Sequence, residues 1–203
     1  MNLSFAGPGI AIIEDFYDDN ELKLIWKELD YLNSKGKFLP PEKTGAARDP
    51  KGNIVKRNKG LFLDEFYANR NFSNILSINR KIWTVIQDLE KDSLFFRYLI
   101  SCNADATLVS YYENNDYYKK HTDTSVYTIL SYFYKEPKKF SGGNLILTDY
   151  DVDIEVKNNM VICIPSILFH EVSPIIMEQE FLNKGYGRYC MAQFLFIGNT
   201  KDD

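Results

Sequence analysis

Residues 106–134, "ATLVSYYENNDYYKKHTDTSVYTILSYFY", contain three short runs of aromatic, β-branched and apolar residues. Runs of this length and composition predict β-strands, and the polar "ENND" between the first two predicts a turn. The pattern continues to the end of the chain. It gives eight candidate strands, at 106–112, 117–123, 126–134, 143–150, 152–156, 160–166, 169–175 and 187–198. Strands in close succession without intervening helices predict a sandwich or double-sheet jelly roll.

The N-terminal part of the chain alternates strand and helix patterns. Residues 9–16 predict a strand, and residues 18–36 and 72–92 predict two helices, the second capped by Ser73. The apolar residues at helical spacing are Leu22, Ile25, Trp26, Leu29 and Leu32 in the first helix and Ile75, Ile78, Ile82, Ile86 and Leu89 in the second. Both helices are expected to pack on a sheet, so the predicted fold class is mainly β with flanking helices (α+β).

The domain organisation is predicted as one domain over residues 1–203. Residues 1–104 are expected to supply helical support and a loop, and residues 105–198 a double-stranded β-helix (jelly-roll) core. Residues 39–60 are rich in Pro, Gly, Lys and Arg, which is typical of a long surface loop that serves as a lid or is partly disordered. Its basic residues leave open a contact with an acidic partner.

Composition excludes several classes of protein. The net charge of −4 argues against a general nucleic-acid binder, and no apolar run approaches the roughly 18 residues that a membrane span needs. The N-terminus lacks the features of a signal peptide, so a cytoplasmic location is expected. Cys102, Cys163 and Cys190 are far apart in apolar contexts and are expected to be small buried residues.

The two histidines of the chain, His121 and His170, both fall on predicted strands of the all-β half. Residues i and i+2 of a strand share a face, so His121 and Asp123 should point together, and His170 could complete a triangle from a neighbouring strand. Two imidazoles and one carboxylate form the ligand set of non-haem Fe(II) oxygenases, which leave coordination positions open. A zinc enzyme can use the same set.

The sequence resembles the 2-oxoglutarate and Fe(II)-dependent dioxygenases, specifically the prolyl 4-hydroxylase-like branch. The stretches that carry the resemblance are "YYENNDYYKKHTD", "GGNLIL", "VICIPSILFHEVSPI" and "GRYCMAQFLF". The resemblance implies that His121, Asp123 and His170 bind Fe(II) and that Arg188 grips the distal carboxylate of 2-oxoglutarate, a role suited to its planar fork. On the same strand face, Cys190 and Ala192 are small and would leave a cavity.

Further residues of the cosubstrate pocket are implied by the same resemblance. Tyr112 and Tyr118 match two aromatic positions of that pocket, and Thr128 and Ser131 are candidates for additional hydrogen bonds to the cosubstrate. Two features depart from the family pattern. Asn115 stands where a Gly usually makes a turn, and the gap between His170 and Arg188 is longer than the usual hairpin. Residues 175–187 therefore either extend the hairpin or add to the rim of the site.

The resemblance implies an oxygenase that uses Fe(II), 2-oxoglutarate and O2, with ascorbate as a further candidate reductant. It would hydroxylate an amino-acid side chain, for which a prolyl residue in a peptide or protein is the first choice, and would release succinate and CO2. The alternatives are a free amino acid, a small metabolite or an alkylated nucleic acid as substrate, or a non-catalytic metal-binding jelly roll. The acidic composition disfavours nucleic acid.

Overall fold

Strand β14 (Arg188–Phe196) runs through the large sheet of the fold, between β5 and β7. The computed structural model describes residues 1–198, without the side chains of residues 90 and 92. The large sheet has the order β1 (Asn2–Gly7), β2 (Ile10–Glu14), β11 (Met160–Pro165), β7 (Tyr127–Phe133), β14, β5 (Ala104–Tyr112) and β4 (Lys59–Phe62). All its pairings are antiparallel.

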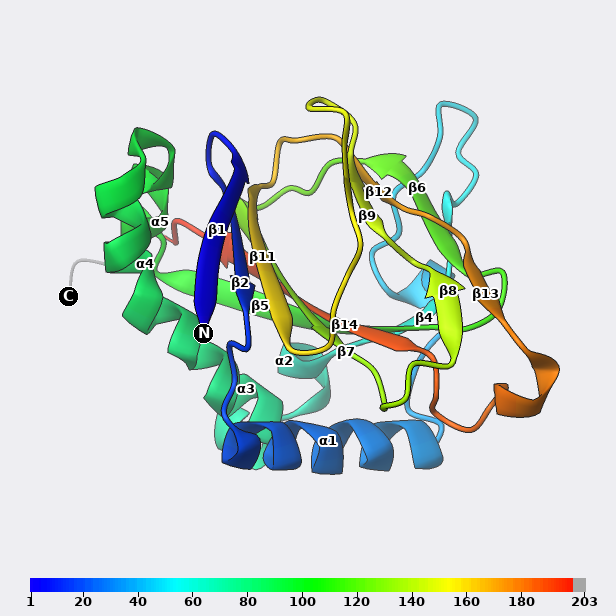
Figure 1. Ribbon diagram of the computed structural model, residues 1–203. Helices are drawn as coiled ribbons and strands as arrows, with labels where there is room; N and C mark the ends of the chain where they lie inside the picture. The colour runs from blue at the N-terminus through cyan, green and yellow to red at the C-terminus, as the bar shows by residue number, and fades with distance from the viewer. Residues whose placement is uncertain (199–203) are drawn as a thin grey trace.

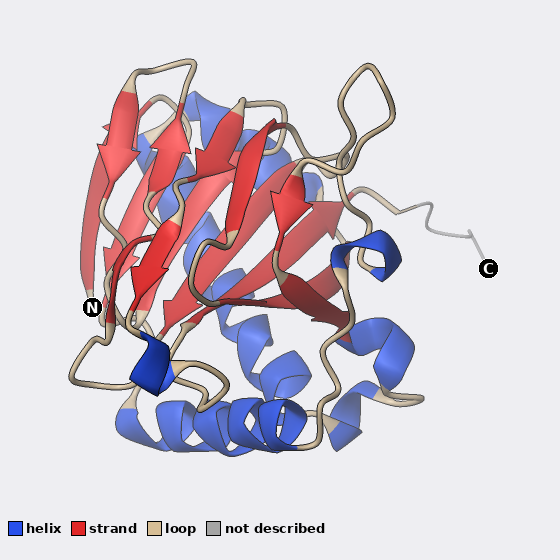
Figure 2. Ribbon diagram, turned by 90° about the vertical axis from the view of Figure 1, so that its right-hand side faces the viewer, coloured by secondary structure: helices blue, strands red, loops and turns tan. Residues whose placement is uncertain are grey.

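A smaller sheet faces the large one (Figure 2). Its order is β10 (Val152–Ile154), β9 (Leu145–Leu147), β12 (His170–Val172), β6 (Tyr117–His121) and β3 (Lys56–Arg57). A two-stranded sheet pairs β8 (Phe140–Gly142) with β13 (Ile175–Met177). The predicted jelly roll with flanking helices is confirmed.

The helices pack on the face of the large sheet that points away from the smaller sheet (Figure 1). They are α1 (Asp19–Ser34), α2 (Leu63–Phe66), α3 (Asn74–Ile78), α4 (Ile82–Asp92) and α5 (Arg97–Ser101). Short 3-10 turns lie at Pro41–Lys43, Arg70–Phe72, Asn79–Lys81, Leu94–Phe96 and Gln179–Phe181. The second predicted helix is therefore interrupted, because the turn Asn79–Lys81 separates α3 from α4.

Helix starts follow the expected capping chemistry. Asp18 accepts hydrogen bonds from the backbone of Asn20 and Glu21 and completes a capping box at the start of α1. Ser73 caps α3, as predicted, by accepting from the Leu76 N–H. The predicted apolar stripes face the sheet, and Ile25, Leu29 and Leu32 are fully buried.

Two packed cores lie on opposite faces of the large sheet. In β14, Tyr189, Met191 and Leu195 pack toward the helices, whereas Cys190 and Ala192 face the smaller sheet. Period-two alternation therefore divides one strand between a structural core and an interior that can carry a site. Cys102, Cys163 and Cys190 are buried free thiols, as expected.

Residues 39–60 are more regular than the sequence predicted. Residues 47–55 form a hairpin, with a bridge between Arg48 and Ile54, and the segment continues into β3 and β4. We call residues 46–56 the finger. The predicted surface loop is therefore partly ordered by β-pairing, because strands β5 and β6 each offer an edge that accepts even a Lys- and Gly-rich segment.

The long segment between His170 and Arg188 also has a defined place. Its strand β13 pairs with β8, and the Ile175 N–H donates to the Asp116 carbonyl, 3.0 Å away. The segment thus extends the hairpin beside the turn at residues 113–116. Among the described residues, no helix is both long and apolar enough to cross a membrane.

A buried carboxylate joins α1 to α3 and yields a first prediction. Glu28 accepts from the Ser73 hydroxyl at 2.7 Å and the Ile75 N–H at 2.9 Å. Glu28→Ala removes both acceptors, and each buried donor left unpaired costs roughly 1–3 kcal/mol. We expect the free energy of unfolding in urea to fall by about 2–4 kcal/mol. Exposed Glu65→Ala is the control, and an equal loss in both variants would contradict this reading.

Candidate active site

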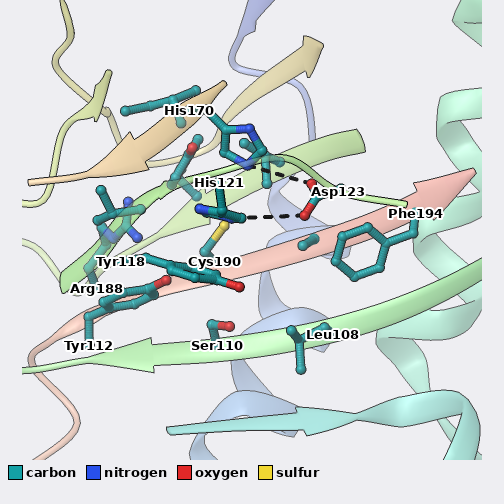
Figure 3. A pocket seen from close by; sticks show the side chains of 15 residues that line it. Leu108, Ser110, Tyr112, Tyr118, His121, Asp123, His170, Arg188, Cys190 and Phe194 are labelled. Atoms are coloured by element: carbon teal, nitrogen blue, oxygen red, sulfur yellow. Dashed lines mark ion pairs between the residues drawn. The ribbon is translucent and has the colours of Figure 1, made fainter. Parts of the chain in front are cut away.

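The two histidines are direct partners across the smaller sheet. His121 is the last residue of β6, His170 is the first of β12, and the two are paired in the strand register. Their ring centroids are 4.3 Å apart. Asp123 lies just beyond β6, with its Oδ1 3.9 Å from His121 Nε2 and its Oδ2 3.5 Å from His170 Nε2 (Figure 3). One donor atom from each residue lies within 4.8 Å of the others.

Backbone carbonyls fix the chemical form of both imidazoles. His121 Nδ1 lies 2.8 Å from the Lys119 carbonyl, and His170 Nδ1 lies 2.9 Å from the Leu168 carbonyl. A carbonyl only accepts, so each Nδ1 carries a proton, and Nε2 is the ring nitrogen available to a metal ion. Burial, reinforced by the neighbouring His170, lowers the pKa of His121 to about 3. Neutral imidazole is the form that binds a metal ion.

Asp123 is placed by a loop contact instead of by a strand. Strand β6 ends at His121, and the Asp123 N–H then donates to the Ser166 carbonyl at 2.9 Å. The carboxylate also accepts from Thr128 Oγ1, 2.6 Å from Oδ2. Thr128 was predicted to bond the cosubstrate, and its hydroxyl is instead engaged with Asp123.

A cavity extends from this cluster between the two sheets, and Arg188 closes its far end (Figure 3). Arg188 is completely buried, with Nη1 donating to the Gly143 carbonyl at 2.8 Å. Its Nε and Nη2 have no hydrogen-bond partner in the described part of the chain. A buried cation with unpaired donors is costly unless an anion meets it. The guanidinium therefore fits a carboxylate ligand, which it can bind in a bidentate manner.

The two glycines before β9 allow the contact with Arg188. Gly142 and Gly143 both have positive φ, at 69° and 72°. A Cβ on Gly142 would lie 2.2 Å from the Pro174 carbonyl oxygen, and one on Gly143 would lie 3.3 Å from Arg188 Cδ. Glycine is required here because only it combines this backbone conformation with such close approach.

Two tyrosines flank the guanidinium. The Arg188 Cζ is 4.3 Å from the ring centroid of Tyr112 and 5.2 Å from that of Tyr132. Tyr112 was predicted for this pocket, but Tyr132 was missed. Ser131, predicted instead, faces the helices and lies 3.2 Å from the Tyr17 hydroxyl, outside this cavity. Tyr132 lies on the same face of β7 as Thr128, so the alternation of side chains along this strand could have indicated Tyr132 as a pocket residue.

Tyr118 connects the finger to the cluster. Its ring stacks on His121, with centroids 3.5 Å apart and an interplanar angle of 14°. Its hydroxyl accepts from the Ala47 N–H at 3.0 Å, and Lys56 Nζ lies 5.3 Å from its ring centroid. Lys56 is buried and donates to the Thr44 carbonyl, and burial lowers its pKa to about 8. This lysine is therefore not part of an exposed basic surface.

Comparison with known proteins agrees with this geometry. A family model described as the 2OG-Fe(II) oxygenase superfamily matches residues 107–196, which include the histidine cluster and Arg188. Residues 107–196 of the chain are therefore similar to the 2OG-Fe(II) oxygenase superfamily. This superfamily uses Fe(II), 2-oxoglutarate and O2, and the described residues fit them: a His-Asp-His cluster for the metal and an unpaired buried guanidinium for a carboxylate. A search of curated protein sequences found no match.

Solved structures show the same fold at low sequence identity. A Pseudomonas putida prolyl-4-hydroxylase is 15% identical with a TM-score of 0.60, covering 96% of this chain and 95% of that one. A Trichoplax adhaerens prolyl hydroxylase, in complex with a hypoxia inducible factor peptide fragment, is 14% identical with a TM-score of 0.60, covering 93% and 83%. OsALKBH1 is 15% identical with a TM-score of 0.56, covering 95% and 99%.

The contact between Tyr118 and the finger yields a second prediction. Tyr118→Phe keeps the ring that stacks on His121 and removes the acceptor of the Ala47 N–H. Losing one hydrogen bond of about 1–1.5 kcal/mol should speed hydrogen exchange of the Ala47 amide by roughly tenfold. Amide exchange measured by NMR tests this. Tyr117→Phe is the control, and unchanged Ala47 exchange in Tyr118→Phe would show that the hydroxyl does not hold the finger.

Proposed function

We propose that this oxygenase hydroxylates a prolyl residue in a peptide or protein, with succinate and CO2 as co-products. His121, Asp123 and His170 hold Fe(II), and Arg188, assisted by Tyr112 and Tyr132, holds the distal carboxylate of 2-oxoglutarate. When bound, the metal and cosubstrate supply the oxidising power for C–H hydroxylation. Residues 105–198 form the catalytic core in this proposal. The unpaired guanidinium of Arg188 at the end of the cavity is the observation that supports the binding of 2-oxoglutarate.

The groove next to Asp123 is suited to an uncharged substrate side chain. A groove of about 450 Å³ borders Asp123 and the finger, and it is lined largely by small and aromatic residues: Gly45, Ala46, Ala47, Phe62, Ala106, Tyr118, Phe194 and Phe196. Among its described lining residues, Asp123 is the single charged one. A neutral ring such as that of proline suits this groove. A phosphate-bearing substrate would find no cation in its lining.

Other residues of the chain shape the cavity wall, orient the two imidazoles and form one side of the substrate groove. Leu108, Leu130, Leu145 and Val172 line the cavity and make part of its wall apolar. An apolar lining strengthens the attraction between Arg188 and a carboxylate because it lowers the local dielectric. The carbonyl-bound Nδ1 atoms hold both imidazoles in one tautomer and orientation. Finger residues Ala46 and Ala47 form one side of the substrate groove.

The cosubstrate assignment gives a third prediction. In an anaerobic titration with Fe(II) and then 2-oxoglutarate, the wild-type protein should develop the visible charge-transfer band of the chelated complex. Arg188→Lys keeps the charge but loses the bidentate fork, and the affinity for 2-oxoglutarate should fall on the order of a hundredfold. Asp123→Ala should lose metal binding, whereas Asp149→Ala, which removes an acceptor of the Phe169 N–H, should retain it. Iron binding without the band would overturn the cosubstrate role.

The substrate assignment gives a fourth prediction. Proline-containing peptides incubated with Fe(II), 2-oxoglutarate and O2 should gain one oxygen atom on proline, as read by tandem mass spectrometry. Ala106→Phe should fill the groove and abolish this transfer while leaving the charge-transfer band intact, because Ala106 lines the groove and not the cosubstrate cavity. Transfer to a free amino acid or a methylated oligonucleotide, with none to peptides, would contradict the prolyl proposal.

A further inference from the structure

A cluster of three hydroxyl groups lies behind the carboxylate of Asp123. Thr128 Oγ1 donates to Asp123 Oδ2 at 2.6 Å, and Ser166 Oγ lies 2.9 Å from Thr128 Oγ1. Ser125 Oγ lies 2.6 Å from Ser166 Oγ. Thr128 and Ser166 are completely buried, and none of the three lines the cosubstrate cavity. They therefore act on Asp123 and not on a ligand in that cavity.

The number of hydroxyl protons fixes which group donates and which accepts at each step of this series of hydroxyl groups. An ionised carboxylate only accepts, so the single hydroxyl proton of Thr128 points to Asp123 Oδ2. The Thr128 oxygen can then accept from Ser166, and Ser166 can accept from Ser125. Hydroxyls aligned in this way polarise one another and strengthen the last bond, which is the one to the carboxylate. The backbone adds a further restraint, because the Ser166 carbonyl accepts from the Asp123 N–H at 2.9 Å.

We propose that Thr128, supported by Ser166 and Ser125, is a positioning residue that fixes the orientation of the Asp123 carboxylate toward His121 and His170. The Thr128 hydrogen bond uses one lone pair of Oδ2, and the carboxylate still faces both rings, with Oδ2 3.5 Å from His170 Nε2 and Oδ1 3.9 Å from His121 Nε2. Without this bond the carboxylate could rotate away from the two imidazoles, and a metal ion would lose a pre-oriented ligand.

This role differs from that of an ordinary buried hydroxyl, and the same strand provides the comparison. Ser131 lies on β7 three residues after Thr128 and is equally buried, but its hydroxyl faces Tyr17 on the helix side of the sheet. Removing either hydroxyl should cost stability. Only removal of the Thr128 hydroxyl should change the metal site.

The test compares Thr128→Val, Thr128→Ser and Ser131→Ala with the wild type. The apo proteins are titrated anaerobically with Co(II), without cosubstrate or substrate, and affinity and the visible ligand-field spectrum are recorded. Thermal unfolding of each apo protein checks the fold. Thr128→Val should bind Co(II) roughly 10–100-fold more weakly and show an altered spectrum. Thr128→Ser should restore affinity to within a few-fold, and Ser131→Ala should bind like wild type.

The outcomes separate this inference from the proposed metal role on which it rests. If the wild type binds no Co(II), the metal role of His121, Asp123 and His170 fails and this inference fails with it. If the wild type binds and a folded Thr128→Val binds equally with the same spectrum, the metal role stands and the positioning role is overturned. Equal losses in Thr128→Val and Ser131→Ala would likewise overturn it, because the effect would then follow stability.

Discussion

The buried guanidinium of Arg188 is the constraint on which the interior of this protein depends. It is completely buried and bonded through Nη1 to one carbonyl, so the surroundings must accommodate a cation with donors to spare. The Gly142–Gly143 pair brings a carbonyl within reach, and two tyrosine rings flank the cation. The Arg188 Nε and Nη2 donors remain unpaired, and together they could bind one carboxylate. The architecture of this end of the cavity is therefore that of an anion site.

At the opposite end of the cavity, hydrogen bonds fix the orientation of the three clustered side chains. The carbonyls of Lys119 and Leu168 accept from Nδ1 of His121 and His170, which leaves each Nε2 directed toward Asp123, and Thr128 donates to one oxygen of Asp123. Apolar side chains, among them Leu130, Leu145 and Val172, line part of the same cavity. A cation-binding end and an anion-binding end thus face each other across one apolar cavity, as a ligand that chelates a metal and carries a distal carboxylate requires.

The helices contribute by covering the other face of the large sheet. Strands β7 and β14 send alternate residues into the helix-packed core and into the cavity. The close packing of one face fixes the positions of side chains on the other, because a strand cannot shift by one residue without exchanging its faces. Stability and function therefore lie on opposite sides of the same strands. The finger contacts the site through the Ala47 N–H, which donates to the hydroxyl of Tyr118, whose ring stacks on His121.

The sequence by itself indicated the strand-rich half, the two main helical regions and the candidate residues His121, Asp123 and His170 through local periodicity and short motifs, and its resemblance to a known family added Arg188 as a candidate. The tertiary structure alone decided which atoms meet. It paired His121 with His170 across strands, directed Thr128 to Asp123, placed Tyr132 instead of Ser131 beside Arg188, and converted part of the predicted loop into strands. The physical reason is that strand partners and register depend on contacts between distant segments, which local sequence patterns do not specify.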